Sequence, residues 1–185
     1  MKMKDYILSD AYILYDNNGF FISLYRYLFS LNYRITCQYR FLRYCYINKV
    51  KIGGMVRILQ MLYNLKCAKY GCCLDYKTDI GFGVRFPHNF PLVIHYGAKI
   101  GRNCIIHPGT QIGSSRTKDG VPTIGNDCFL GNGCHIIGNC RVGDNCFIAP
   151  GAFVCKDIPD GSVVGFGVNN IISTKGRECV ELYLR

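Results

Sequence analysis

A repeat of six residues governs the middle of this sequence. No helix has a period of six, and an amphipathic strand has a period of two. A hexad of this kind predicts a parallel β-helix, in which each repeat is one short strand and a turn. The aliphatic member points inward, and a small residue four places later allows a tight corner. The aliphatic members are Ile100, Ile106, Ile112, Ile124, Leu130, Ile136, Val142, Ile148 and Val154, and the small residues are Cys104, Thr110, Cys128, Cys134, Cys140, Cys146 and Ala152.

Two irregularities interrupt the repeat. The phase slips by two positions between Leu92 and Ile94, which predicts a bulge or a wide corner near residues 89–91. Residues 114–122 are polar, and Lys118 falls at an inward position. Because a charge is not buried without a partner, we expect this segment to leave the coil as a loop. Loops on a rigid scaffold are frequent places for functional residues.

The segment that precedes the repeat is basic and aromatic. Residues 1–70 contain eleven Lys or Arg against three Asp. We predict helices over residues 20–31, 36–47 and 55–69, the last with Met55, Ile58, Leu59, Leu62 and Leu65 on one face. The favoured interpretation is a helical cap on the β-helix, since solenoids need capping. The alternative is peripheral contact with an anionic membrane or an acidic partner. No nucleic-acid motif accompanies the charge, so nucleic acid is not an expected partner.

Cysteine usage and the first residues set the expected compartment. Five of the twelve cysteines occupy the small corner position of the hexad, so they are expected to be packing residues with reduced thiols. Asp5, Asp10 and Asp16 interrupt the first twenty residues, which argues against a signal peptide. No apolar run reaches the length of a membrane span. The expected location is cytoplasmic, with the inner face of a membrane as an option. We divide the chain into residues 1–70, a β-helix at 71–173 and a tail at 174–185.

Residues 70–173 resemble the hexapeptide-repeat acyltransferases. The similarity is greatest to the serine acetyltransferase-like group, which includes capsular polysaccharide O-acetyltransferases. The matching strings are Phe86-Pro87-His88, Ile112-Gly113, Pro122-Thr123-Ile124-Gly125-Asn126-Asp127, Leu130-Gly131-Asn132-Gly133, Ile136-Ile137-Gly138-Asn139 and Lys156-Asp157-Ile158-Pro159. The resemblance implies a mainly β fold, a left-handed parallel β-helix with an N-terminal α-helical segment. It also implies a homotrimer with active sites between subunits.

The resemblance further implies direct transfer from acetyl-CoA without a metal. By motif match His88 is the general base, since an alcohol needs its proton accepted as it attacks a thioester. His107, one coil away, and Arg116, in the polar loop, are candidates for binding the acceptor. The implied cofactor contacts, made largely through exposed backbone amides along the β-helix edge, are Gly113, Ser114, Gly131, Asn132, Pro150, Gly151, Cys155 and Lys156.

Departures from the family pattern bear on the acceptor. In serine acetyltransferases an Asp precedes the catalytic histidine and a second histidine precedes the loop proline; here these positions are Pro87 and Val121. We therefore favour a hydroxyl of a sugar or surface-polysaccharide precursor, with serine as the alternative acceptor.

Two other function classes use the same solenoid. Zinc enzymes of the carbonic anhydrase type need three histidines, two of them five residues apart. Here the histidines lie at intervals of 7, 12 and 28 residues, so a zinc site is not predicted. A catalytically inert scaffold is the third class, and His88 with the polar loop argues against it.

Overall fold

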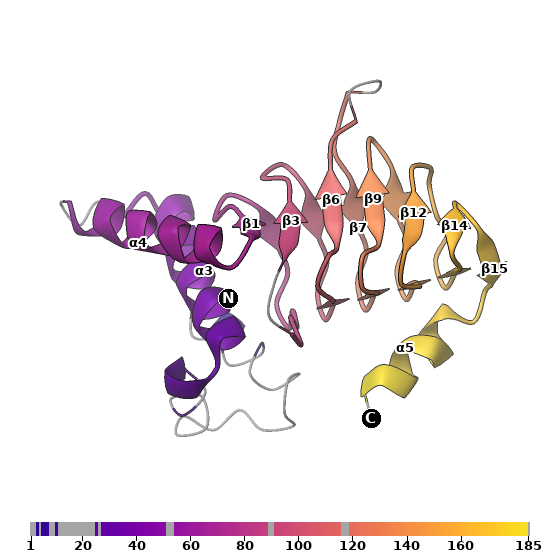
Figure 1. The fold of residues 1–185 in the computed structure, drawn as a ribbon, viewed down its shortest axis with the longest axis horizontal. Helices are drawn as coiled ribbons and strands as arrows, with labels where there is room; N and C mark the ends of the chain where they lie inside the picture. The colour runs from indigo at the N-terminus through magenta and orange to yellow at the C-terminus, as the bar shows by residue number, and fades with distance from the viewer. Residues whose placement is uncertain are drawn as a thin grey trace.

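The molecule consists of a helical end joined to a long β-helix (Figure 1). The computed structural model describes residues 3, 5–7, 10, 25, 27–50, 54–88, 91–115 and 119–184, without the side chains of 182–184. Its helices are α3 (Leu31–Ile47) and α4 (Met55–Lys69) before the β-helix and α5 (Gly176–Leu184) after it. The helix predicted at 55–69 is confirmed. The predicted second helix begins earlier, at Leu31, where the Ser30 side chain accepts a hydrogen bond from the Tyr33 N–H at 3.4 Å. Half of the helix predicted at 20–31 lies outside the described residues, and the described residues 25 and 27–29 are helical.

The described residues form fifteen short strands in three sheets, one on each side of the coil. Sheet 1 contains β1 (Cys72–Leu74), β3 (Leu92–Ile94), β6 (Gln111–Gly113), β9 (His135–Ile137), β12 (Ala152–Val154) and β14 (Gly167–Val168). Sheet 2 contains β2 (Asp79–Ile80), β4 (Lys99–Ile100), β7 (Thr123–Ile124) and β10 (Arg141–Val142). Sheet 3 contains β5 (Ile105–Ile106), β8 (Phe129–Leu130), β11 (Phe147–Ile148), β13 (Val163–Val164) and β15 (Ile171–Ser173).

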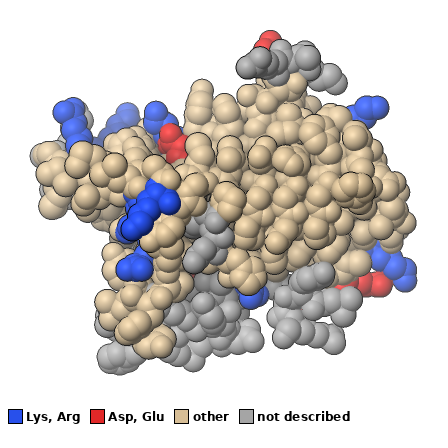
Figure 2. All heavy atoms as spheres, viewed as in Figure 1, with Lys and Arg blue, Asp and Glu red and all other residues tan. Residues whose placement is uncertain are grey.

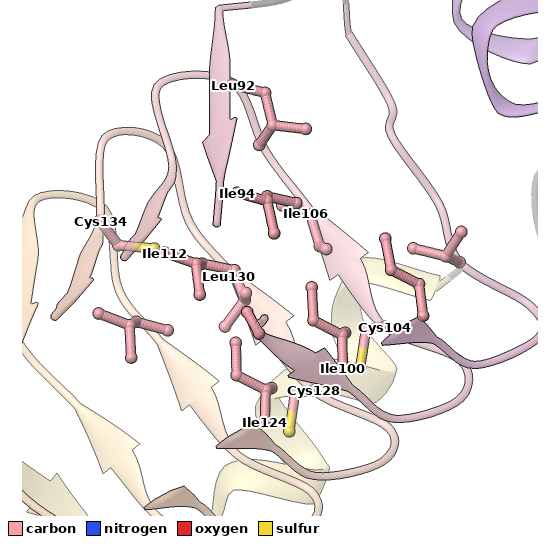
Figure 3. Close-up of a cluster of buried hydrophobic side chains, with 14 of the residues drawn as sticks. Leu92, Ile94, Ile100, Cys104, Ile106, Ile112, Ile124, Cys128, Leu130 and Cys134 are labelled. Carbon is pink, nitrogen blue, oxygen red and sulfur yellow. The ribbon is translucent and has the colours of Figure 1, made fainter. Parts of the chain in front are cut away.

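The register of these sheets confirms the predicted parallel β-helix with an N-terminal helical segment. Ile94 pairs with Ile112, and Phe129 pairs with Phe147, each eighteen positions further along. Three hexads therefore make one coil, and every third hexad adds a strand to the same sheet. All pairs are parallel except β13 with β15. The inward aliphatic side chains stack along the axis as one continuous core (Figure 3).

The small corner residues are buried thiols that bond between coils. The Cys104, Cys128 and Cys146 thiols donate to the carbonyl oxygens of Gly125, Gly143 and Pro159 at 3.2–3.3 Å. Burial raises the pKa of Cys134 to about 12. All twelve cysteines are unpaired. As the sequence indicated, the corner cysteines serve as packing residues.

Both predicted irregularities are present. Ile80 pairs with Ile100, twenty positions along, so the intervening coil holds two extra residues, in the corner between Phe86 and Leu92. Ile100 pairs with Ile124, twenty-four positions along, so the segment between β6 and β7 adds six residues and projects from the coil (Figure 1). Because the insertion equals one hexad, the sequence repeat continues in phase across it.

Helix α3 fastens the helical segment to the first coil. The Tyr39 hydroxyl donates to the Thr78 carbonyl at 2.7 Å. Arg40 donates to the Ile80 carbonyl at 2.7 Å and to both carboxylate oxygens of Asp10 at 2.8 and 3.0 Å. Burial by itself would lower the pKa of Arg40, but the charge of Asp10 raises it, so the guanidinium stays charged. From α4, Tyr63 and Cys67 face inward, whereas the apolar face that the sequence analysis assigned to a cap is exposed.

Helix α5 covers the outer surface of sheet 3. Its Val180 packs in a second apolar cluster with Ile105, Phe129, Phe147 and Val163. These strand residues point away from the coil interior and are nevertheless buried. Sheet 2 is different, because its outward side chains are Asp79, Lys99, Thr123 and Arg141, all exposed.

Candidate active site

Two histidines meet at the corner between sheet 3 and sheet 1. His88 lies in the widened corner, after Arg85 bridges to Ile105 of sheet 3 and before β3 begins. His107 lies in the same corner of the next coil, after β5. Their ring centroids are 5.9 Å apart. His88 is exposed and His107 is partly buried. The stacking of the coils thus places the exposed His88 imidazole beside the partly buried His107 imidazole.

The surroundings of His107 favour its neutral form. Burial lowers its pKa below the ordinary 6.5, and the charges of His88 and Arg85 lower it further. A hydrogen bond between the side chains of Asn132 and His107 acts in the opposite direction. A neutral imidazole can both donate and accept a hydrogen bond, which suits it to hold a hydroxyl group.

An aromatic column supports this pair. The His107 ring lies 4.9 Å from the Phe129 ring, and Phe129 stacks on Phe147 at 4.6 Å with an interplanar angle of 3°. Because Val180 of α5 packs in one apolar cluster with both phenylalanines, the column is packed on its outer side. The position of His107 therefore depends on a residue from the next coil and on the C-terminal helix.

The predicted cofactor residues divide between two edges of sheet 1. Gly131, Asn132, Pro150 and Gly151 lie at the edge that carries His107. The other four, Gly113, Ser114, Cys155 and Lys156, lie at the opposite edge, where the chain turns toward sheet 2. Within one chain the structure does not bring the two groups together. Arg116 lies outside the described residues.

Backbone amides at several of these positions already have partners. Asn169 Oδ1 accepts hydrogen bonds from the N–H groups of Cys155 and Lys156, at 2.8 and 3.1 Å. The Gly131 N–H donates to the Ile148 carbonyl at 2.8 Å. These three amides therefore have hydrogen-bond partners within the chain. The Lys156 and Asn132 side chains are exposed and remain suitable contacts.

Two glycines at the His107 edge are required by the fold itself. A Cβ on Gly131 would lie 2.6 Å from the Pro150 nitrogen of the next coil. Gly151 has a φ of +70° and carries the Phe166 ring close above it. Side chains are disfavoured at both positions, the first by contact and the second by backbone conformation. Gly113 is different, because a Cβ there would meet its nearest atom, Ile137 Cδ1, at 3.8 Å.

The remaining histidines have local structural partners. His95 Nδ1 accepts the Gly97 N–H at 3.1 Å, and its ring stacks on Tyr96 at 4.4 Å. His135 Nδ1 lies 3.2 Å from Gln111 Oε1 on sheet 1. Neither belongs to the His88–His107 pair. Among the described residues, no group of three or more His, Cys, Asp or Glu side chains is arranged to hold a metal ion.

Sequence reasoning missed three residues that shape the site. Arg85 acts on His107 electrostatically, Phe129 packs against its ring, and Asn169 occupies two backbone amides of the opposite edge. A signal existed for Phe129. Ile105, Phe129, Phe147 and Val163 are apolar at outward positions of one sheet, which indicates a covered face.

A comparison with protein families bears on this architecture. Residues 122–156 match the family described as "Bacterial transferase hexapeptide (six repeats)". The matched residues run from just before β7 to just after β12, so this family's repeat accounts for part of the β-helix. A search of curated proteins by sequence finds no match for this hexapeptide-repeat chain.

Several solved structures with the same fold are serine acetyltransferases. The enzyme from Brucella abortus strain S19 in complex with coenzyme A has a TM-score of 0.75 and 22% identity, with 91% of this chain and 67% of that chain covered. The Neisseria gonorrhoeae enzyme in complex with serine has a TM-score of 0.75 and 22% identity, covering 92% and 69%. The soybean apoenzyme has a TM-score of 0.74 and 19% identity, covering 92% and 69%. The hexapeptide-repeat chain thus has the left-handed β-helix fold and spans about two thirds of the length of these proteins.

Proposed function

We propose that this protein is an acetyl-CoA-dependent O-acetyltransferase with His88 as its general base. The observation that carries the proposal is the exposed His88 imidazole on a widened corner, 5.9 Å from the ring of His107. The structural similarity to a coenzyme A complex supports the choice of acyl donor. The unpaired thiols support a reducing, cytoplasmic location.

The proposed reaction needs one proton acceptor and no covalent enzyme intermediate. His88 accepts the proton of the acceptor hydroxyl while the oxygen attacks the thioester carbonyl carbon of acetyl-CoA. The tetrahedral intermediate then breaks its carbon–sulfur bond, and the CoA sulfur takes the proton back from the imidazolium. Such a base contributes roughly 10²–10⁴-fold to the rate.

His107 is suited to hold the acceptor next to this base. Its partial burial and its pKa below 6.5 keep the ring neutral. A second charged imidazole would oppose the charge that forms on His88 during the reaction. A neutral His107 can hydrogen-bond the acceptor without that cost.

We further propose a homotrimer in which neighbouring protomers complete the site. The cofactor residues lie at two edges of sheet 1, and one chain does not bring them together. A threefold arrangement would set the edge with Lys156 of one protomer toward the edge with His88 of the next. Cross-linking and light scattering give the mass of the assembly.

The proposed acceptor is either L-serine or a sugar hydroxyl, and different observations favour each. The comparisons support L-serine more directly, because the similar solved structures are serine acetyltransferases and one contains serine. A sugar hydroxyl is favoured as the acceptor by the sequence departures at Pro87 and Val121. The groups around the His88–His107 pair favour it too. An amino acid presents an ammonium group, yet the described groups that act on the pair are a guanidinium, a phenyl ring and an amide, with no carboxylate in this set.

A thiol-release assay distinguishes the acceptors. Purified protein is given acetyl-CoA with L-serine, or with a panel of nucleotide sugars and free sugars, and released CoA is measured. Release with serine alone supports serine acetylation, and release with a sugar alone supports sugar acetylation. If no acceptor releases CoA and millimolar CoA does not raise the melting temperature, the protein is a scaffold and the proposed activity is wrong.

A further inference from the structure

Helix α4 carries a wide apolar face that is exposed in the described part of the chain. Only Tyr63 and Cys67 of this helix are buried. On the opposite arc Ile58, Leu62 and Leu65 are 56%, 51% and 60% exposed. Further exposed apolar residues of the helix are Met55, Leu59 and Met61. The face runs along the whole helix, about 22 Å at 1.5 Å per residue.

An exposed apolar face of this extent marks an interaction surface. Within α4 the apolar positions recur at three- and four-residue spacing, so they form one continuous strip. The neighbouring end of α3 adds exposed Tyr44, Tyr46 and Ile47. Tyrosine rings of this kind are enriched where apolar and aqueous phases meet.

The charge around this face is of one sign. Residues 17–74 contain nine Lys or Arg and no Asp or Glu. Arg57, Lys66 and Lys69 belong to α4 itself, and Lys49 is exposed beyond the end of α3. Figure 2 shows Lys and Arg side chains gathered over the helical end of the molecule. The partner that fits this surface is therefore anionic.

A second copy related by a twofold axis fits this surface poorly. A twofold contact would place the same patch on both subunits. Arg57 and Lys69 would then face like charges, because the segment has no carboxylate to pair with them. An anionic lipid surface satisfies both the apolar arc and the basic residues beside it.

A groove beside α4 has the same character. It has a volume of about 570 Å³ and lies between the end of α3 and the start of α4. Leu42, Val50 and Val56 contribute apolar walls, and Lys49 also lines it. A groove with apolar walls and an ammonium group matches a phospholipid, which has an acyl chain and a phosphate.

We propose that α4 binds the surface of an anionic phospholipid bilayer. The Ile58, Leu62 and Leu65 side chains enter the boundary between headgroups and acyl chains, and Arg57 and Lys69 contact phosphates. Among the described helices, none combines the length and apolar content needed to cross a bilayer, so the contact is peripheral. The contact does not depend on the proposed acetyl transfer.

This docking would turn the helical end of the β-helix, whose first coil carries His88, toward the membrane. His88 lies on the first coil, which α3 contacts directly, as Asn32 donates to the Phe86 carbonyl at 3.1 Å. An acceptor carried on a lipid would then reach His88 from the bilayer side.

Vesicle flotation tests the proposal with the full chain. The protein is mixed with vesicles of phosphatidylglycerol and phosphatidylcholine, or of phosphatidylcholine alone, at low and at physiological salt. We expect flotation with the anionic vesicles, with weaker binding as salt rises. Ile58→Gln/Leu62→Gln/Leu65→Gln should reduce binding at least tenfold. The Arg57→Gln/Lys69→Gln variant should bind the anionic vesicles more weakly, with a loss of affinity of roughly fivefold for each charge removed.

Matched variants on the β-helix, outside the helical segment, serve as controls. Val168→Gln/Ile172→Gln removes exposed apolar residues, and Lys99→Gln/Arg141→Gln removes exposed charges from sheet 2. Both should bind vesicles as the parent does. Absence of flotation with anionic vesicles at low salt, or parental binding by the triple α4 variant, overturns the proposal. If the parent does not float and the triple variant lowers the assembly mass in light scattering, the face is instead a contact between copies.

Discussion

The imidazole rings of His88 and His107 come from consecutive coils of the β-helix and lie 5.9 Å apart. Nineteen residues separate them in the sequence, so their proximity is a product of coil stacking. The first is exposed and the second is held against Phe129. This relationship underlies the proposed division of labour, with His88 accepting the proton and His107 holding the acceptor.

His88→Ala should lower kcat by roughly 10²–10⁴-fold, because the hydroxyl loses its proton acceptor. The measurement is CoA release at saturating acetyl-CoA, with circular dichroism to confirm the fold. His135→Ala is the matched control, since that ring lies on sheet 1 and outside the pair. Near-parental turnover by His88→Ala would remove His88 from the mechanism.

His107 should make folding stability depend on pH. Burial, His88 and Arg85 lower its pKa in the folded state, so below pH ~6.5 the unfolded chain binds a proton that the folded chain resists. The stability contributed by neutral His107 is thus present above this pH and is lost as the pH falls through it. When the pH is lowered from ~8 to ~5.5, the urea concentration at the unfolding midpoint should fall more for the parent than for His107→Gln. Equal losses in the two proteins would contradict this account of His107.

Asp10→Asn should destabilise the protein by roughly 3–5 kcal/mol, since it leaves the buried Arg40 guanidinium without its anion. Urea denaturation measures the change. Asp79→Asn is the comparison, because its pair with Arg43 is largely exposed on the carboxylate side and should contribute about 0–1 kcal/mol. Similar losses from both substitutions would mean that the Asp10–Arg40 pair does not anchor the helical segment.

A comparison of Gly131→Ala with Gly113→Ala should distinguish an effect on folding stability from an effect on cofactor binding. The first places a Cβ 2.6 Å from Pro150 N, so the coils must shift, and a loss of about 1–3 kcal/mol is expected. The second meets nothing closer than 3.8 Å and should leave the melting temperature unchanged. If Gly113 lies against coenzyme A, Gly113→Ala raises the KM for acetyl-CoA severalfold. An unchanged KM would exclude Gly113 as a close contact.

The sequence predicted the solenoid because its physics is local and periodic. Each inward aliphatic residue meets its counterpart in the next coil, and each corner needs a small residue, so the requirement repeats every six positions. The same count predicted the widened corner near residues 89–91, next to His88, and the loop after β6. The site was less predictable, because Arg85, Phe129 and Asn132 reach His107 from different coils. Hexad position alone did not show that Asn169 occupies the Cys155 and Lys156 amides.

What the sequence determined by itself is the parallel β-helix, its two interruptions and His88 as the candidate base. The tertiary structure decided which outward faces are covered. Sheet 3 and α4 both present apolar side chains outward, but α5 packs on sheet 3, whereas among the described residues the outer face of α4 stays exposed. An inward position is fixed by the repeat, since the coil must close around it. An outward position depends on which distant segment folds back over it, and that is settled only when the whole chain is packed.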